Sequence, residues 1–375
     1  MIVKMRKGAR PEDIQAVEDK LHELGYQTGK LVGTEIVLIG VYGDVSQLPV
    51  GEIQEMAGVD ELIRISRAYK RAAQKGDPTD RRYVHFPVGN VMIGEDLVVI
   101  AGPCSVESER QIMEAARMVK EAGGHILRGG VHKYRSSPYS GWEGVGADSE
   151  ESLRRGLEWI VKAGREYDLP VAVEILDHTK IHLYEDVGVD CLQIGEPNSR
   201  NTVLLNALRE TPLPVIHKRA NSLDCEAYLL WTERMMTTGK ENIILCERGI
   251  LGPNKYTRNT MDLGTVAAFY YQLTGLPVAV DASHGTGRRD LVHPMTLAGI
   301  MAGASVILVE AHPNPLIAKS DGYQALFPEQ LKNLVEAAHI VWDVRRKTDA
   351  LYQPSVVFEP QYEKRVEADR KRFFG

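Results

Sequence analysis

The sequence has few of the features that mark secreted, membrane or nucleic-acid-binding proteins. Its four cysteines, Cys104, Cys191, Cys225 and Cys246, form no CxxC pair, so we expect reduced thiols rather than disulfides. No apolar run reaches the ~18 residues that a transmembrane helix needs, and residues 1–14 lack the apolar core of a signal peptide. The net charge of −6 provides no basic field to attract nucleic acid or anionic lipid. These absences predict a cytoplasmic protein without a membrane or nucleic-acid partner.

What is present is an ordinary globular composition in two parts. The 375 residues are 43% hydrophobic and 26% charged, and this length predicts roughly two domains. Residues 1–70 have strand-like and helix-like segments in the order βαββαβ, which is typical of a ferredoxin-like α+β domain. No polar cluster in this part suggests catalysis. A packing or oligomerisation role and a small-ligand regulatory role therefore both stay open.

Residues 97–344 alternate between apolar, strand-like runs and segments of helical periodicity. The runs end at Cys104, Gly130, Glu174, Gly195, Arg219, Gly249, His284 and His312. Eight strand–helix units over about 250 residues predict a (β/α)8 TIM barrel. A doubly wound sheet is the alternative, but it usually has a glycine-rich phosphate fingerprint after its first strand, and AGPCSVES is not one.

Two further segments flank the predicted barrel. Residues 71–96 are expected to form a linker and then a hairpin, with Gly89-Asn90 at its turn, that could plug one end of the barrel. Residues 345–375 form a highly charged C-terminal extension, expected to be a helix docked on the barrel or on a neighbouring subunit.

Four residues that can bind a metal occur at neighbouring strand ends of this predicted barrel. Cys104 ends the first strand, His284 the seventh and Glu310 the eighth, and Asp321 lies in the last loop. A strand cysteine alone is more often a small buried apolar residue, but closure of the barrel brings these strands side by side. The mixed soft and hard donors suit Mn, Fe, Co or Zn better than Mg or Ca. The sequence thus predicts a metal site.

Cationic residues gather at three other strand ends. They are Arg128, Lys133, Arg135, Lys218 and Arg248. Arginine binds phosphate or carboxylate with two parallel hydrogen bonds, and lysine acts as a point charge that can also donate a proton. These cations predict sites for a substrate pair with several anionic groups. Ion pairing with Glu174, Glu247 and Asp281 is the alternative interpretation.

Five motifs at these strand ends resemble one enzyme family. They are IAGPCSVES, LRGGVHKYRSSPYS, LCERGI with YTRNTMDL, DASHGTGRRD, and VEAHPNP with KSDG. Together they resemble 3-deoxy-D-arabino-heptulosonate-7-phosphate (DAHP) synthase, in the form that carries an N-terminal ferredoxin-like domain. The resemblance covers roughly residues 1–344.

The resemblance implies a metal-dependent, aldol-type condensation of phosphoenolpyruvate with erythrose 4-phosphate, the first step of the shikimate pathway to aromatic amino acids. It implies roles for the matching residues: Cys104, His284, Glu310 and Asp321 as metal ligands, Arg128, Lys133, Lys218 and Arg248 as phosphoenolpyruvate contacts with Glu174 in the same pocket, and Arg135 and Ser136 as the clamp for the aldose phosphate. It also implies an aromatic effector on the N-terminal domain and a homo-oligomer.

Three departures from the family pattern fall in the substrate pockets. Glu196-Pro197 stands where the family has Ala-Arg, Tyr134 replaces a proline and Ala220 replaces a glycine. Arg200 is the cation expected to replace the missing arginine. Two alternatives therefore stay open: a specialised paralogue that uses a different aldose phosphate or a related enol acid, and a catalytically silent paralogue that binds ligand or regulates a true synthase.

Overall fold

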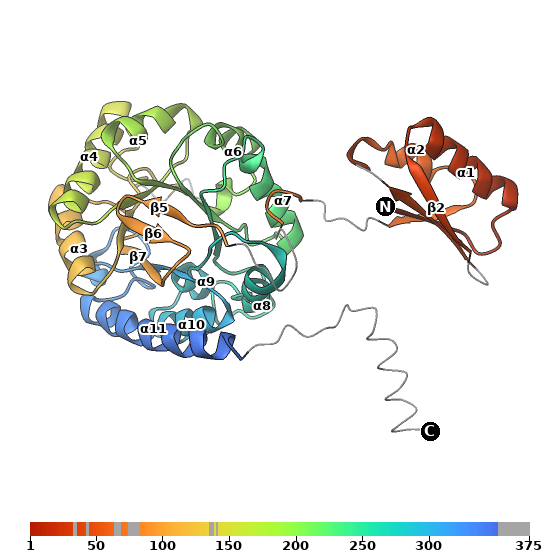
Figure 1. Cartoon of the computed structure of the whole chain (residues 1–375). Coiled ribbons are helices and arrows are strands. Elements are labelled where there is room, and N and C mark those ends of the chain that lie inside the picture. Colours follow the sequence, from red (N-terminus) through yellow and green to blue (C-terminus); the bar gives the residue numbers. More distant parts are fainter. Residues whose placement is uncertain are drawn as a thin grey trace, which may run out of the picture. The chain divides into compact units, whose positions relative to one another are not determined.

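The computed structural model describes residues 1–32, 36–42, 45–63, 69–73, 83–134, 139 and 142–351 of the chain. The chain divides into two compact units, Met1–Lys70 and Arg71–Gly375 (Figure 1). Among the described residues, no helix is both long and apolar enough to cross a membrane.

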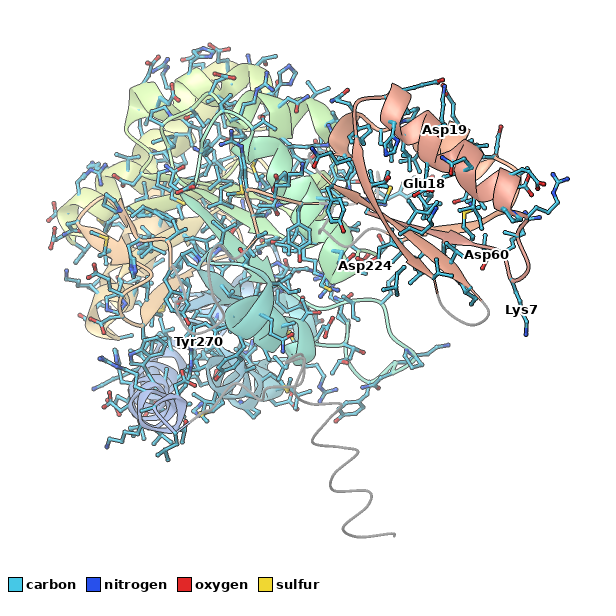
Figure 2. The ribbon with its side chains drawn as sticks, turned by 45° about the vertical axis from the view of Figure 1, so that its right-hand side comes forward. Lys7, Glu18, Asp19, Asp60, Asp224 and Tyr270 are labelled. Carbon is cyan, nitrogen blue, oxygen red and sulfur yellow. The ribbon has the colours of Figure 1, made fainter. Side chains whose placement is uncertain are left out.

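The first unit is a small α+β domain, as predicted. Its elements are β1 (Ile2–Met5), α1 (Pro11–Glu23), β2 (Gln27–Val32), β3 (Val37–Tyr42), η1 (Val45–Gln47), α2 (Val50–Gln54) and β4 (Val59–Ile63). The strands form an antiparallel sheet in the order β2-β3-β1-β4, the order of a ferredoxin-like fold. Glu18 of α1, labelled in Figure 2, accepts a 2.6 Å hydrogen bond from Lys30 of β2 and so ties the helix to the edge strand.

The second unit is the predicted (β/α)8 barrel. Its eight parallel strands are β7 (Val98–Gly102), β8 (Ile126–Gly129), β9 (Val171–Glu174), β10 (Cys191–Ile194), β11 (Val215–Lys218), β12 (Ile243–Glu247), β13 (Val278–Val280) and β14 (Val306–Glu310). Pairing of β14 with β7, from Val306↔Val98 to Glu310↔Gly102, closes the ring. Closure brings the first, seventh and eighth barrel strands together, which is what the predicted metal site requires.

Helices surround the barrel (Figure 1). They are α3 (Glu109–Glu121), α4 (Glu150–Glu166), α5 (Ile181–Val187), α6 (Thr202–Leu208), α7 (Cys225–Met236), α8 (Leu263–Ala268) with the π-turn η4 (Phe269–Leu273), α10 (Arg289–Ala302) and α11 (Pro328–Asp349). Short turns follow four of the strands: η2 (His178–Lys180), η3 (Glu196–Asn198), α9 (Ala282–Thr286) and η5 (Pro315–Ile317). Side chains cap several of the helices; Ser108, for example, accepts the Gln111 N–H at the start of α3.

A hairpin of β5 (Phe86–Val88) and β6 (Val91–Ile93) lies across one end of the barrel (Figure 1). Its Phe86, Val88 and Ile93 pack into the apolar cluster that Val98 and Ile126, near the starts of their strands, help to form. The hairpin therefore closes the N-terminal end of the barrel and leaves the opposite end to the loops that carry the polar residues.

Helix α11 continues past residue 344, into the segment whose composition suggested a separate tail. Arg345 is only 2% exposed and donates to the carbonyl oxygens of Ile300 (3.1 Å) and Ala304 (2.8 Å). A charged side chain in this stretch therefore anchors the helix to the barrel. Residues 352–375 lie outside the described part of the chain.

Candidate metal centre and anion pocket

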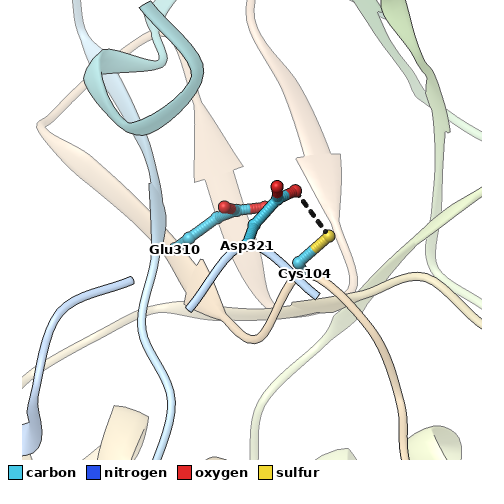
Figure 3. Close-up of side chains that lie close together, drawn as sticks. All are labelled: Cys104, Glu310 and Asp321. Atoms are coloured by element: carbon cyan, nitrogen blue, oxygen red, sulfur yellow. Dashed lines mark hydrogen bonds between the residues drawn. The ribbon is translucent and has the colours of Figure 1, made fainter. Parts of the chain in front are cut away.

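The four residues predicted to bind a metal converge at the C-terminal end of the barrel. The Cys104 thiol donates to Asp321 Oδ2 at 3.1 Å, and the ligand atoms of Cys104, Glu310 and Asp321 lie within 4.8 Å of one another (Figure 3). His284 reaches the cluster on the side of the carboxylates, with its Nε2 3.3 Å from Glu310 Oε1 and 4.0 Å from Asp321 Oδ2. One thiol, one imidazole and two carboxylates thus share one small space.

Hydrogen bonds to Asp281 fix the orientation of the His284 ring. Asp281 Oδ2 accepts the Nδ1–H at 2.7 Å, Oδ1 accepts the backbone N–H of His284 at 3.0 Å, and Lys218 Nζ also donates to Oδ2 at 2.7 Å. Burial alone would raise the pKa of Asp281, but His284 and Lys218 hold it well below its usual range. Since the ionised Asp281 can only accept, the ring carries a proton on Nδ1, and its Nε2 faces the carboxylates of Glu310 and Asp321. Histidine metal ligands are commonly held in this way.

Glu310 is also held by its neighbours. Arg128 donates to its Oε1 at 2.8 Å and Gln324 to its Oε2 at 2.6 Å, and Glu310 is 1% exposed. Burial raises the pKa of the Cys104 thiol to about 12, so the thiol keeps its proton in this structure and shares it with Asp321. A bound cation would displace that proton, because coordination deprotonates a thiol. The donor set therefore fits a transition metal such as Mn, Fe, Co or Zn.

Three of the predicted anion-binding cations have carboxylate partners inside the barrel. Lys133 contacts Glu174, Lys218 contacts Asp281 and Arg128 contacts Glu310. Burial disfavours both charges of the Lys133–Glu174 pair, but their mutual attraction keeps the pKa of Lys133 raised and that of Glu174 lowered. The partners of Lys133 and Lys218 are those of the alternative interpretation of the sequence. Arg128 pairs with Glu310 instead, and Glu247, the third carboxylate of that interpretation, pairs with Arg219.

Arg248 differs from these three cations. It is 4% exposed and forms no ion pair with a carboxylate of the described residues, and its Nε, like that of Arg128, has no hydrogen-bond partner there. Its NH1 makes only a long contact, 3.4 Å, to the Gly249 carbonyl. Burial lowers the pKa of Arg248, although the charges of Asp281 and Glu196 oppose that effect. A buried guanidinium with unused donors is suited to bind an anion that enters the pocket.

The remaining predicted site residues are less informative. Arg135 and Ser136 lie outside the described residues. Arg200 is exposed in the turn before α6, and within the described chain it makes no hydrogen bond or ion pair. Glu196, half-buried in η3, accepts the Asn221 N–H at 3.2 Å from the loop after β11, and Pro197 is exposed. This hydrogen bond connects Glu196 to the loop that follows β11.

The sequence analysis did not predict the contacts that hold the predicted ligands in place. They are made by Gln324, Ser105 and Glu107, and by Asp281, which it named only as a possible partner of the cations. The local spacing of Asp281, three residues before His284, was a usable signal, because a carboxylate at that position can cap the helical turn and reach the ring. Gln324 and Glu107 gave no such signal, since their partners depend on the path of a distant loop.

Comparisons with known proteins agree with this architecture. A family model described as the DAHP synthetase I family matches residues 63–350, and one described as the DAHP synthase ferredoxin-like domain matches residues 1–67. A phospho-2-dehydro-3-deoxyheptonate aldolase from Thermotoga maritima is 36% identical over 355 residues, which cover 94% of this chain and 98% of that protein.

A crystal structure of a phospho-2-dehydro-3-deoxyheptonate aldolase (DAHP synthase) from Thermotoga maritima has a TM-score of 0.82 at 35% identity, and the match covers 92% of this chain and 97% of that one. A 2-dehydro-3-deoxyphosphooctonate aldolase from Francisella tularensis subsp. holarctica is 29% identical over 282 residues, which cover 69% of this chain and 97% of that protein.

Proposed function

Since the chain belongs to the DAHP synthetase I family, we propose that it condenses phosphoenolpyruvate with erythrose 4-phosphate to give 3-deoxy-D-arabino-heptulosonate 7-phosphate and phosphate. Its family membership confirms the resemblance seen in the motifs. The observation that carries the proposal is the juxtaposition of two features at one barrel end: four convergent metal donors, and the buried, unpaired guanidinium of Arg248.

A divalent metal is the proposed cofactor, held by Cys104, His284, Glu310 and Asp321. When bound, it would supply a Lewis acid for the aldehyde oxygen of the sugar phosphate. The thiol and imidazole donors favour Mn, Fe, Co or Zn. His284 is prepared for this role, because Asp281 holds its proton on the ring nitrogen that faces away from the cluster.

The cations are assigned to the two substrates. Arg128, Lys218 and Arg248 bind the anionic groups of phosphoenolpyruvate, and Arg135 and Ser136 bind the phosphate of the aldose. Lys133, held by Glu174, neutralises the carboxylate of phosphoenolpyruvate and donates the proton that the aldehyde oxygen takes up. The enol carbon forms the new C–C bond to the aldehyde carbon, water adds at the adjacent carbon, and phosphate leaves by C–O cleavage.

The decisive experiment follows phosphate release from metal-loaded protein given phosphoenolpyruvate and one aldose phosphate at a time. Turnover with erythrose 4-phosphate supports the proposal. Turnover only with another aldose phosphate identifies a specialised paralogue, and no turnover by protein that demonstrably holds metal identifies a silent one.

A different aldose phosphate is the second candidate, and Glu196 is the residue that favours it. This acid lies within electrostatic reach of Arg248 and contacts the loop after β11, so the phosphate pocket carries a charge that the family pattern does not have. The exposed Arg200 is the proposed compensating cation, and Arg200→Ala should then raise the KM for one phosphorylated substrate selectively.

The remaining proposals concern regulation and assembly. We propose that an aromatic end product binds the ferredoxin-like unit, that the enzyme is a cytoplasmic homo-oligomer, and that residues 345–375 contribute to docking. The family match of residues 1–67 supports the regulatory role. Inhibition by each aromatic amino acid, measured on the whole chain and on residues 71–375, tests the effector proposal, and sedimentation of the whole chain tests the assembly.

A further inference from the structure

Asp321 has an unusual backbone conformation for a candidate metal ligand. Its φ of +50° lies in the left-handed region, which residues other than glycine seldom adopt, although aspartate tolerates it better than most. Such a conformation persists only where the surroundings hold it in place. The contacts of the neighbouring residues therefore decide where the Asp321 carboxylate lies.

Three successive residues of the Asp321 loop contact the segment that follows β7. The Lys319 N–H donates to Glu107 Oε1 at 2.7 Å, the hydroxyls of Ser320 and Ser105 are 2.7 Å apart, and Asp321 accepts from Cys104. Residues 104–107 and 319–321 thus run alongside each other and contact at three points. We call residues 104–107 the clamp segment.

The clamp segment is itself fixed to the barrel. Gly130 N donates to the Cys104 carbonyl at 3.0 Å, and Val106 N donates to the Gly130 carbonyl at 2.9 Å, which extends the β7–β8 pairing beyond the strands. The clamp segment carries one candidate ligand, Cys104, and holds the loop of another, Asp321. A rigid segment of this kind sets the distance between the two ligands.

Glu107 is the charged member of the clamp. It is 11% exposed at its side chain, and the same Oε1 lies 3.5 Å from His312 Nε2. The His312 Nδ1 accepts the Asn314 N–H at 3.0 Å, so its proton lies on Nε2 and faces Glu107. Glu107 Oε1 thus accepts a hydrogen bond from Lys319, near one end of the loop between β14 and Asp321. It also lies close to His312 at the other end, whose Nε2 makes no hydrogen bond within the described part of the chain.

We infer that Glu107 is a positioning residue that holds Asp321 in ligating geometry through the hydrogen bond that it accepts from the Lys319 N–H. This inference rests on the proposed metal site. It predicts that the loss of Glu107 weakens metal binding although Glu107 is no ligand, by the 10- to 100-fold that outer-sphere changes typically cause.

The test titrates Co²⁺ into the whole, metal-free chain and follows the absorption band of a cobalt–thiolate bond. Glu107→Ala should raise the Kd for Co²⁺ about 10- to 100-fold and keep the thiolate band at saturation, because Cys104 is unchanged. Glu107→Gln keeps an acceptor for the Lys319 N–H and should restore most of the affinity. Glu109→Ala removes a partly exposed carboxylate two residues away, which pairs with Lys162, and should leave the Kd unchanged.

The outcomes separate this inference from the proposed function. Wild-type protein that binds no Co²⁺ overturns the metal site itself. Wild-type affinity in Glu107→Ala overturns the positioning role alone, as does an equal loss in Glu107→Ala and Glu107→Gln. If Glu107→Ala does not fold, Ser105→Ala decides the question. It removes the contact between the Ser105 and Ser320 hydroxyls and should also raise the Kd for Co²⁺. An unchanged Kd refutes the inference.

Discussion

The barrel mouth has a metal side, formed by the four candidate ligands, and an anion side, around Arg248. The two sides differ in how their buried charges are paired. On the metal side, each candidate ligand has a partner: His284 has Asp281, Glu310 has Arg128 and Gln324, and the Cys104 proton bridges to Asp321. On the anion side, Arg248 is buried and forms no ion pair with a carboxylate of the described residues, and its Nε has no hydrogen-bond partner. Without a metal, the Cys104 proton takes the place of the cation, so each candidate ligand on the metal side has a partner. On the anion side, the positive charge of Arg248 has no partner until an anion binds.

Removal of the Cys104 thiol should have the largest effect on metal binding and turnover. Cys104→Ala removes the soft donor, so we expect loss of tightly bound metal and a fall in turnover of roughly 10³-fold or more, since a Lewis acid supplies several kcal/mol. Metal analysis and phosphate release on the same sample measure both. Cys191→Ala is the matched control, because Cys191 is equally buried but lies at the start of β10, among the apolar residues at the hairpin end. A metal-bound, active Cys104→Ala protein would disprove the ligand assignment.

Replacement of Arg248 should show how much its unpaired charge destabilises the ligand-free protein. Arg248→Met removes an unpaired buried cation, so the ligand-free protein should gain stability while the KM for phosphoenolpyruvate rises about 100-fold. Arg219 is the matched control: it is 2% exposed, but Glu247 and Asp262 accept from it at 2.8 and 2.9 Å. Arg219→Met should destabilise the fold by about 3–5 kcal/mol, because it leaves carboxylates unpaired. Thermal unfolding and substrate kinetics distinguish the two variants.

This pair of arginines also marks the limit of the sequence analysis. Arg219 and Arg248 each follow a buried strand directly, and nothing local distinguishes them. The strand-end rule of the barrel was enough to bring Cys104, His284, Glu310 and Asp321 together, because strand order fixes which ends are neighbours. Which cation finds a carboxylate depends instead on loop paths between residues far apart in the chain, such as Arg219 and Asp262. The contact of Glu107 with Lys319 was hidden for the same reason.

A buried histidine between β11 and α7 gives a pH test of how this fold disfavours an unpaired buried charge. His217 lies beside Lys218 on β11 and contacts Ser199 and Thr232, and burial lowers its pKa to about 4. Its pKa in the unfolded chain is about 6.5, so the unfolded chain binds the proton first as the pH falls. Stability should therefore be complete above pH ~6.5 and decline by about 3 kcal/mol towards pH 4.

Chemical denaturation across this pH range measures that decline in the free energy of unfolding. His217→Asn should be less stable at neutral pH but should lose less stability on acidification than the wild type. His178→Asn, a change at an exposed histidine, is the matched control and should keep the wild-type decline. An identical decline in wild type and His217→Asn would show that other groups cause it.

The smallest expected effect concerns the acid that departs from the family pattern. Glu196→Gln keeps an acceptor for the Asn221 N–H but removes a negative charge whose field reaches Arg248. The KM for phosphoenolpyruvate should fall about fivefold, equivalent to about 1 kcal/mol, and the gain should shrink as salt screens the charge. Glu210→Gln makes the same charge change at an exposed site after α6 and should alter neither value. If Glu196→Gln instead raises the KM, the Glu196 carboxylate contributes to binding. It would then accept a hydrogen bond from a donor group of the substrate rather than repel the substrate's negative charge.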